Sequence, residues 1–142
     1  MSGGITCGGH AVTIVITYPE ALLTTAQRLI ADGECSIAVV VAHMACEISA
    51  ERALSRAFTA NGIGYLDEAV DDLLPGYNLA NDRVRNLYNA VTGNEIEKQS
   101  FWQTFKESAT RRNRAVHKGK VVTKAEAETS FKAAKDLVAF LK

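Results

Sequence analysis

The sequence predicts an all-α protein: an up-and-down bundle of five to six helices with a short N-terminal strand or arm. Alanine occurs 21 times and proline only twice, at Pro19 and Pro75, and alanine costs least to hold in a helix whereas proline costs most. Apolar residues also recur with helical spacing in several stretches that contain no breaker. With 142 residues, of which 47% are hydrophobic, the chain has the size of one domain with a sizeable core.

The first 18 residues are expected to be separate from a helical domain that spans residues 19–142. Ser2–Gly9 is rich in glycine and predicts a flexible leader, and Ala11–Tyr18 is an apolar, β-branched run that predicts a short strand or extended arm. The run is too short to span a bilayer, and no basic residue precedes it as in a secretory signal. A lone strand needs a pairing partner, for which a second subunit is one candidate.

Breakers and capping residues mark the predicted helices. Pro19 suits the first turn of a helix and Gly33 its end, and the short break after this helix predicts an antiparallel hairpin with the next one. Thr123 and Glu126 have the spacing of a capping box that opens the last helix. The expected helices cover residues 19–31, 35–60, 66–74, 79–91, 96–117 and 124–142.

Charge is balanced over the whole chain but not along it. The formal net charge is zero, so bulk charge predicts neither a nucleic-acid nor a membrane partner. Five acids and no lysine or arginine lie between Ala57 and Asp82, whereas six lysines or arginines and one acid lie between Lys106 and Lys120. Taken alone, both runs are consistent with solvated faces. The cysteines are odd in number without ligand-like spacing, which favours a reducing cytoplasm: Cys7, Cys35 and Cys46.

Two of the predicted helices carry a charge where a core residue should point. At 100° per residue, Glu47 falls within the apolar stripe of helix 35–60 and Arg112 within that of helix 96–117. A buried unpaired charge costs several kcal/mol, so we expect the two side chains to face each other or a shared cleft. The apolar members of the stripes are Val40, Met44, Leu54 and Phe58 in the first helix and Phe101, Phe105, Ala109 and Val116 in the second.

The segment Arg111–His117 closes the second of these helices with residues that can perform acid–base chemistry. Asn113 and His117 are four residues apart and project from one side of the helix, and the long side chain of Arg112 can lean toward the helix end. His117 lies in the last turn, where the helix dipole favours a protonated imidazole that can exchange a proton near neutral pH. A neighbouring guanidinium can stabilise the charge of a phosphorane transition state.

This arrangement resembles the HEPN superfamily of small helical domains. Members of the family carry an arginine and a histidine separated by four to six residues, often with a polar residue directly after the arginine; here these are Arg112, Asn113 and His117. The helical segment Ser36–Glu47 is similar to the family helix whose acid lies near the motif, and the helix from Lys124 onward is similar to the family's last helix.

The resemblance implies a metal-independent endoribonuclease without a cofactor, which acts in the cytoplasm as a toxin or phage-defence effector. Arg112 would hold the RNA phosphate. His117 would help move protons as a 2′-hydroxyl attacks that phosphate and leaves a 2′,3′-cyclic phosphate. Asn113 would position the phosphate or His117, and Glu47 would orient Arg112. The remaining basic residues would attract the RNA backbone by charge: Arg111, Arg114, Lys118 and Lys120.

The resemblance also bears on partners. Catalytic members of the family form homodimers in which two motifs line one cleft, and some are encoded beside a nucleotidyltransferase antitoxin. A homodimer, an RNA substrate and an antitoxin or other protein inhibitor are therefore the expected partners, and no membrane partner is expected.

Two other interpretations stay open. The family includes non-catalytic members, so the chain is alternatively an interaction or scaffold module that acts through dimerisation and a protein partner, with Arg112 and Glu47 as a buried pair. The second alternative is a metal site. His43 and Glu47 are four residues apart on one helix, a spacing that can hold one ion from one face, with His117 as the obvious third ligand. Without a metal, we expect His43 to be a partly exposed helix residue.

Overall fold

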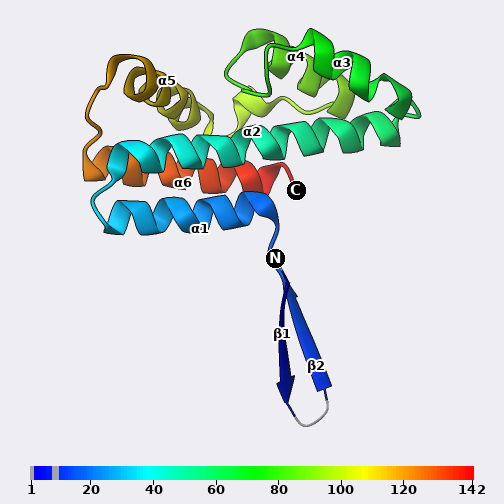
Figure 1. The fold of residues 1–142 in the computed structure, drawn as a ribbon. Helices are drawn as coiled ribbons and strands as arrows, with labels where there is room; N and C mark the ends of the chain where they lie inside the picture. Colours follow the sequence, from blue (N-terminus) through cyan, green and yellow to red (C-terminus); the bar gives the residue numbers. More distant parts are fainter. Residues whose placement is uncertain (1, 8–9) are drawn as a thin grey trace.

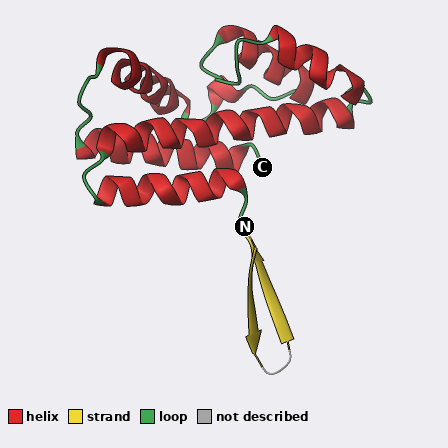
Figure 2. Ribbon diagram, viewed as in Figure 1, coloured by secondary structure: helices red, strands yellow, loops and turns green. Residues whose placement is uncertain are grey.

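A computed structural model describes residues 2–7 and 10–142 of the chain, with side chains described from residue 15 onward. The described residues form a helical bundle, as predicted, preceded by a short hairpin (Figures 1 and 2). The helices α1, α2 and α6 lie side by side, while α5 and the pair α3 and α4 lie on the other side of α2 (Figure 1). None of the helices in this part of the chain is both long and apolar enough to cross a membrane. The helices are α1 (Tyr18–Ala31), α2 (Cys35–Ala60), α3 (Asp67–Leu73), α4 (Asp82–Thr92), α5 (Trp102–Lys118) and α6 (Lys124–Phe140), with 3₁₀ turns at Gly64–Leu66 and Ile96–Lys98.

The N-terminal residues form an antiparallel hairpin of β1 (Ser2–Cys7) and β2 (His10–Val15). The segment Ser2–Cys7, expected as part of a flexible leader, is thus a strand, and the two glycines between the strands lie outside the described residues. The expected strand Ala11–Tyr18 begins one residue earlier and ends at Val15, because Tyr18 already opens α1. Pairing with β1 gives the expected strand a partner within the chain along one of its edges.

Helix boundaries match the prediction where local signals are strong. The helix α2 has the predicted bounds, and α6 opens with the predicted capping box. The amide of Glu126 donates to the Thr123 hydroxyl at 3.2 Å, and the amide of Thr123 donates to the Glu126 carboxylate at 3.0 Å. The prediction of one helix over 96–117 is wrong at its start, since α5 begins only at Trp102. Ile96 is fully buried, but it lies in a 3₁₀ turn. Its apolar side chain therefore anchors the connection between α4 and α5 in the core and does not belong to a helix face.

The segment that joins α3 to α4 is irregular but firmly held. The predicted helix over 79–91 begins three residues late, at Asp82, because Leu79 fills the core from a loop and is 1% exposed. Asn81 then caps α4, with its Oδ1 accepting from the amides of Arg83 at 2.9 Å and Val84 at 3.4 Å. This loop lies against α2 and α5 and supplies one wall of the pocket described below.

The core is built around α2, which contacts α1, α4, α5 and α6. Many of its buried positions are alanines, such as Ala42, Ala45 and Ala50, and small side chains let neighbouring helices approach closely. Because helices pack on several sides of α2, its buried face is wider than a single stripe. Two expectations were therefore wrong: Met44, placed in the stripe, is 40% exposed, and His43, expected to be partly exposed, is 3% exposed.

We predict that Thr123→Ala lowers the free energy of unfolding by about 1 kcal/mol, because the amide of Glu126 at the start of α6 loses its acceptor. Urea unfolding followed by circular dichroism measures this change. The matched control is Thr123→Ser, which keeps the hydroxyl and should unfold close to the wild type. Equal losses in both variants would show that the cap does not stabilise α6.

Candidate functional site

Arg112 and Glu47 line the same pocket, which confirms that the two inward charges share a cleft. The cavity has a volume of about 350 Å³ and lies between α2, α5 and the loop that joins α3 to α4. We call it the Arg112 pocket. Its other lining residues come from the loop and the start of α4: Pro75, Gly76, Asn78, Asn81 and Val84.

Glu47 is held between a buried histidine and the arginine. Nε2 of His43 lies 3.2 Å from Oε1 of Glu47, and the His43 ring stacks on Phe105 with 6.0 Å between ring centroids. This close contact with His43, together with the positive charge of Arg112, holds the pKa of Glu47 below its ordinary value, although partial burial acts in the opposite direction. Glu47 is therefore ionised at neutral pH, opposite the guanidinium of Arg112.

Arg112 is tied to its neighbour in the motif. Its Nη1 donates a hydrogen bond to Oδ1 of Asn113 at 2.9 Å, whereas its Nε is buried and has no hydrogen-bond partner among the described residues. His117 is exposed, as is Asn113. Five residues correspond to about 140° around a helix, so Arg112 faces α2 while His117 lies on the solvent side of α5. A single chain therefore does not place the two side chains in one pocket.

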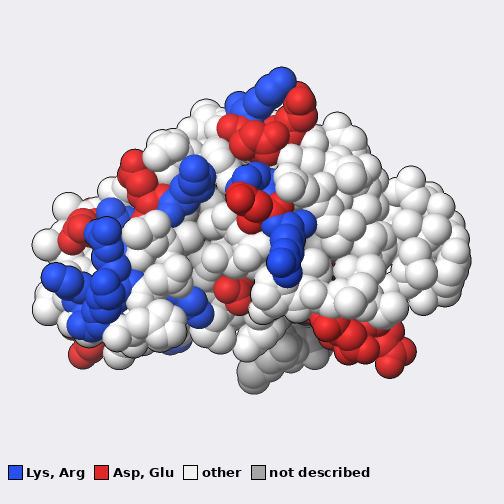
Figure 3. Space-filling view, turned by 90° about the horizontal axis from the view of Figure 1, so that it is seen from above, with Lys and Arg blue, Asp and Glu red and all other residues white. Residues whose placement is uncertain are grey.

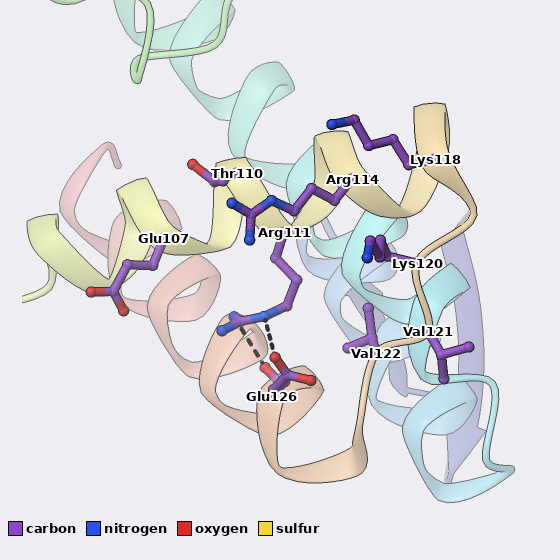
Figure 4. Close-up of a pocket in the computed structure, with 9 residues that line it drawn as sticks. All are labelled: Glu107, Thr110, Arg111, Arg114, Lys118, Lys120, Val121, Val122 and Glu126. Carbon is purple, nitrogen blue, oxygen red and sulfur yellow. Dashed lines mark hydrogen bonds and ion pairs between the residues drawn. The ribbon is translucent and has the colours of Figure 1, made fainter.

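The other basic residues predicted to contact RNA line a second cavity, which we call the basic cleft (Figure 4). It has a volume of about 710 Å³ and is bounded by α5, the start of α6 and the connection between them. The end of the molecule that carries α5 is where lysine and arginine side chains gather (Figure 3). The residues that line the cleft are Glu107, Thr110, Arg111, Arg114, Lys118, Lys120, Val121, Val122 and Glu126.

Arg111 differs from the other basic side chains of the cleft because it points toward α6 (Figure 4). Its Nη1 donates to Oγ of Ser130 at 2.7 Å, and its Nε lies 3.5 Å from Oε2 of Glu126. Ser130 is fully buried. The other three basic side chains are exposed and form no ion pair with another described residue. Arg111 thus joins α5 to α6, a contact that local sequence could not show because Ser130 lies on another helix.

The alternative metal site is not formed in this structure. His43 and Glu47 lie together on α2, but His117 lies on the exposed side of α5. Across residues 2–7 and 10–142, no group of three or more histidine, cysteine, aspartate or glutamate side chains is arranged to hold a metal ion.

Comparison of the chain with protein-family models, with curated proteins and with solved structures finds no match. The chemistry of the Arg112 pocket and of the basic cleft is therefore the basis for a function.

We predict that Arg111→Gln lowers the free energy of unfolding by about 1 to 3 kcal/mol, because the buried hydroxyl of Ser130 loses its partner. The matched control is Arg114→Gln on the same helix, which removes an exposed charge and should change stability by no more than about 0.5 kcal/mol. Urea unfolding of both variants tests this difference. If the two variants were equally stable, Arg111 would have no structural role.

We also predict that Glu47→Gln removes part of the pH dependence of stability. The folded pKa of Glu47 is below the ordinary value of 4.5, so between these two values the unfolded chain binds more protons and stability rises with pH. The contribution of Glu47 is complete above about pH 4.5 and is lost as the pH falls through the folded pKa.

Urea unfolding at several pH values between about 3 and 6 measures this contribution. The difference in unfolding free energy between wild type and Glu47→Gln should increase over the lower half of this range and then stay constant. Glu51→Gln, an exposed position one turn further along α2, is the control. A difference that does not vary with pH would contradict the prediction.

Proposed function

We propose that this protein is a metal-independent endoribonuclease of the HEPN type. The observation that supports the proposal best is that Glu47 and Arg112 line one pocket, where the charge of Arg112 helps to lower the pKa of Glu47. Asn113 is bonded to Arg112, and His117 lies one turn further along α5. The arginine, polar residue and histidine of the family resemblance therefore lie on one helix, with an acid of the long helix α2 beside the arginine.

Arg112 would bind the scissile phosphate and its developing charge. A guanidinium donates through several N–H groups in a planar arrangement that suits phosphate oxygens. Here Asn113 already bonds the guanidinium, and Glu47 lies in the same pocket with the opposite charge, so less reorganisation would be needed when charge develops in the transition state.

His117 would transfer protons in the cleavage step. The 2′-oxygen forms a bond to phosphorus while the bond from phosphorus to the 5′-oxygen breaks, which leaves a 2′,3′-cyclic phosphate and a 5′-hydroxyl end. The 2′-hydroxyl loses a proton and the leaving 5′-oxygen gains one. An exposed histidine can exchange protons near neutral pH, and Asn113 would orient it or the phosphate.

A homodimer would complete this site. Since Arg112 and His117 lie about 140° apart around α5, one copy does not direct both side chains at the same phosphate. A second copy that faces the first across a two-fold axis would bring His117 of one chain toward Arg112 of the other. In this proposal the catalytic cleft lies between the two subunits.

The basic cleft would bind the RNA backbone at phosphates that lie at a distance from the one that is cleaved. Arg114, Lys118 and Lys120 are exposed there without an ionic partner among the described residues, and such side chains bind phosphates by charge with a strong dependence on salt. Arg111 would contribute less, because it is engaged with α6. A role as a cytoplasmic toxin or phage-defence effector, controlled by an antitoxin or other inhibitor, follows from the same resemblance and is proposed with it.

We predict that the wild-type protein cleaves a structured RNA in excess EDTA and leaves 2′,3′-cyclic phosphate ends. His117→Ala should be slower by at least about 100-fold, because proton transfer by a positioned side chain contributes about this much or more. Gel analysis of end-labelled RNA, with and without treatment that opens cyclic phosphates, gives both the rate and the product ends.

Lys106→Ala is the matched control, because Lys106 is an exposed basic residue of α5 that lies outside the basic cleft. It should cleave as the wild type does. If neither wild type nor His117→Ala cleaves RNA while both remain folded dimers, the result would contradict the ribonuclease function and favour the scaffold module with a protein partner. Cleavage that EDTA abolishes would point instead to metal-dependent chemistry.

A further inference from the structure

The Arg112 pocket has a second wall that the chemistry proposed for Arg112 does not use. This wall is the loop from Pro75 to Asn81 between α3 and α4. The cavity of about 350 Å³ is within the range of roughly 300 to 1,000 Å³ that is usual for small-molecule sites. If Arg112 binds the scissile phosphate, a group attached to that phosphate and inserted into the pocket would contact this loop.

The loop presents two asparagines whose orientation is set by the backbone. Oδ1 of Asn78 accepts a hydrogen bond from the amide of Ala80 at 3.0 Å, and Oδ1 of Asn81 accepts from the first turn of α4. In a carboxamide only the oxygen accepts hydrogen bonds, and the NH2 group donates. These bonds therefore fix the orientation of both carboxamides. Each Nδ2 therefore remains a donor without a hydrogen-bond acceptor among the described residues.

The loop is also held rigidly in place. Leu79 fills the core between the two asparagines, and the hydroxyl of Tyr77 donates to Asp71 at 2.6 Å. Because the loop is already ordered, little conformational entropy is lost when its donors bind a ligand, and such preorganisation favours selective binding.

The opposite wall offers an acceptor. Oε1 of Glu47 lies 3.2 Å from Nε2 of His43, and each carboxylate oxygen has two lone pairs, so both oxygens can accept further hydrogen bonds. The charges of Glu47 and Arg112 cancel, so the interior of the pocket suits a neutral polar group better than a second phosphate. The pocket therefore combines a carboxylate on α2 with amide donors on the loop, beside a guanidinium.

A nucleobase is a neutral group with this pattern of donors and acceptors. Proteins read bases in single-stranded RNA through hydrogen bonds to their exposed edges. Guanine carries two adjacent donors, N1–H and the N2 amino group, that one carboxylate can accept together, and it carries the acceptors O6 and N7 for amide or guanidinium donors. Adenine and cytosine each offer one amino donor beside ring acceptors, and uracil offers a single N–H between two carbonyls.

We propose that the Arg112 pocket binds the base next to the scissile phosphate and prefers guanine. Glu47 accepts from its N1–H and N2 amino group, and the carboxamides of Asn78 and Asn81 donate to its acceptor atoms. The placement of the phosphate on Arg112 rests on the function proposed above. Asn78 and Asn81 are then specificity-determining residues that take no part in the bond-breaking step.

The test is equilibrium binding of guanosine 3′-monophosphate, uridine 3′-monophosphate and inorganic phosphate, measured by isothermal titration calorimetry. We expect wild type to bind the guanosine nucleotide about tenfold more tightly than the uridine nucleotide, because a well-made set of base contacts discriminates by about this factor or more. The variants are Asn78→Asp and Asn81→Asp. Each keeps the oxygen that bonds the backbone, and aspartate caps a helix as well as asparagine does, so the loop should fold while the donor is lost.

Both variants should lose most of the preference for guanosine over uridine. Asn86→Asp adds the same charge at an exposed position of α4 outside the pocket. This control variant should keep the preference for guanosine. Equal binding of the two nucleotides by wild type, or an equal loss of preference in all three variants, would overturn the proposal even if RNA is cleaved. Guanosine preference without RNA cleavage would support the base site and overturn the ribonuclease function.

Discussion

The inward placement of opposite charges on α2 and α5, at the wall of one pocket, is the constraint on which the layout of the candidate site depends. A carboxylate on α2 and a guanidinium on α5 are both partly withdrawn from water, and each would be costly without the other. Once Arg112 faces Glu47, the helical period assigns a direction to every other residue of the motif. Arg111, Arg114 and Lys118 line the basic cleft, and His117 is exposed to solvent and lines neither cavity. The inward side of α5 thus carries Arg112 in its pocket, apart from the basic cleft lined by the other charges of the helix.

The parts of the fold that could be predicted are those with local signals. The bounds of α2 follow from its flanking turns, and the start of α6 follows from the Thr123 and Glu126 box. The start of α5 could not be found, because Ile96 is apolar for a reason unrelated to a helix face. The burial of His43 also escaped prediction, since a helix that packs on several sides has no single stripe from which to read its core.

The candidate site likewise has a part that could be predicted from the sequence and a part that could not. The contact of Glu47 with Arg112 could be inferred because each charge breaks an otherwise apolar stripe. The loop wall could not, because Asn78 and Asn81 lie in irregular backbone whose position is set by the burial of Leu79. The bond between Arg111 and Ser130 joins two helices, and its geometry exists only after α6 packs on α5. Interactions between elements that are far apart in sequence leave no periodic pattern.

In the proposed function, the charge distribution would give the two cavities different roles in the capture of a polyanion. The whole chain is neutral, so it has no long-range attraction for RNA, yet the end of α5 is basic and α3 carries four acids: Asp67, Glu68, Asp71 and Asp72. Screening limits the reach of such charges to about 10 Å, so in the proposed function an RNA strand would be held only where it meets the basic cleft. Charge contacts of this kind do not discriminate sequence. In the proposed function, selectivity would then come from the Arg112 pocket, where opposite charges lie together and hydrogen-bond geometry would distinguish one ligand from another.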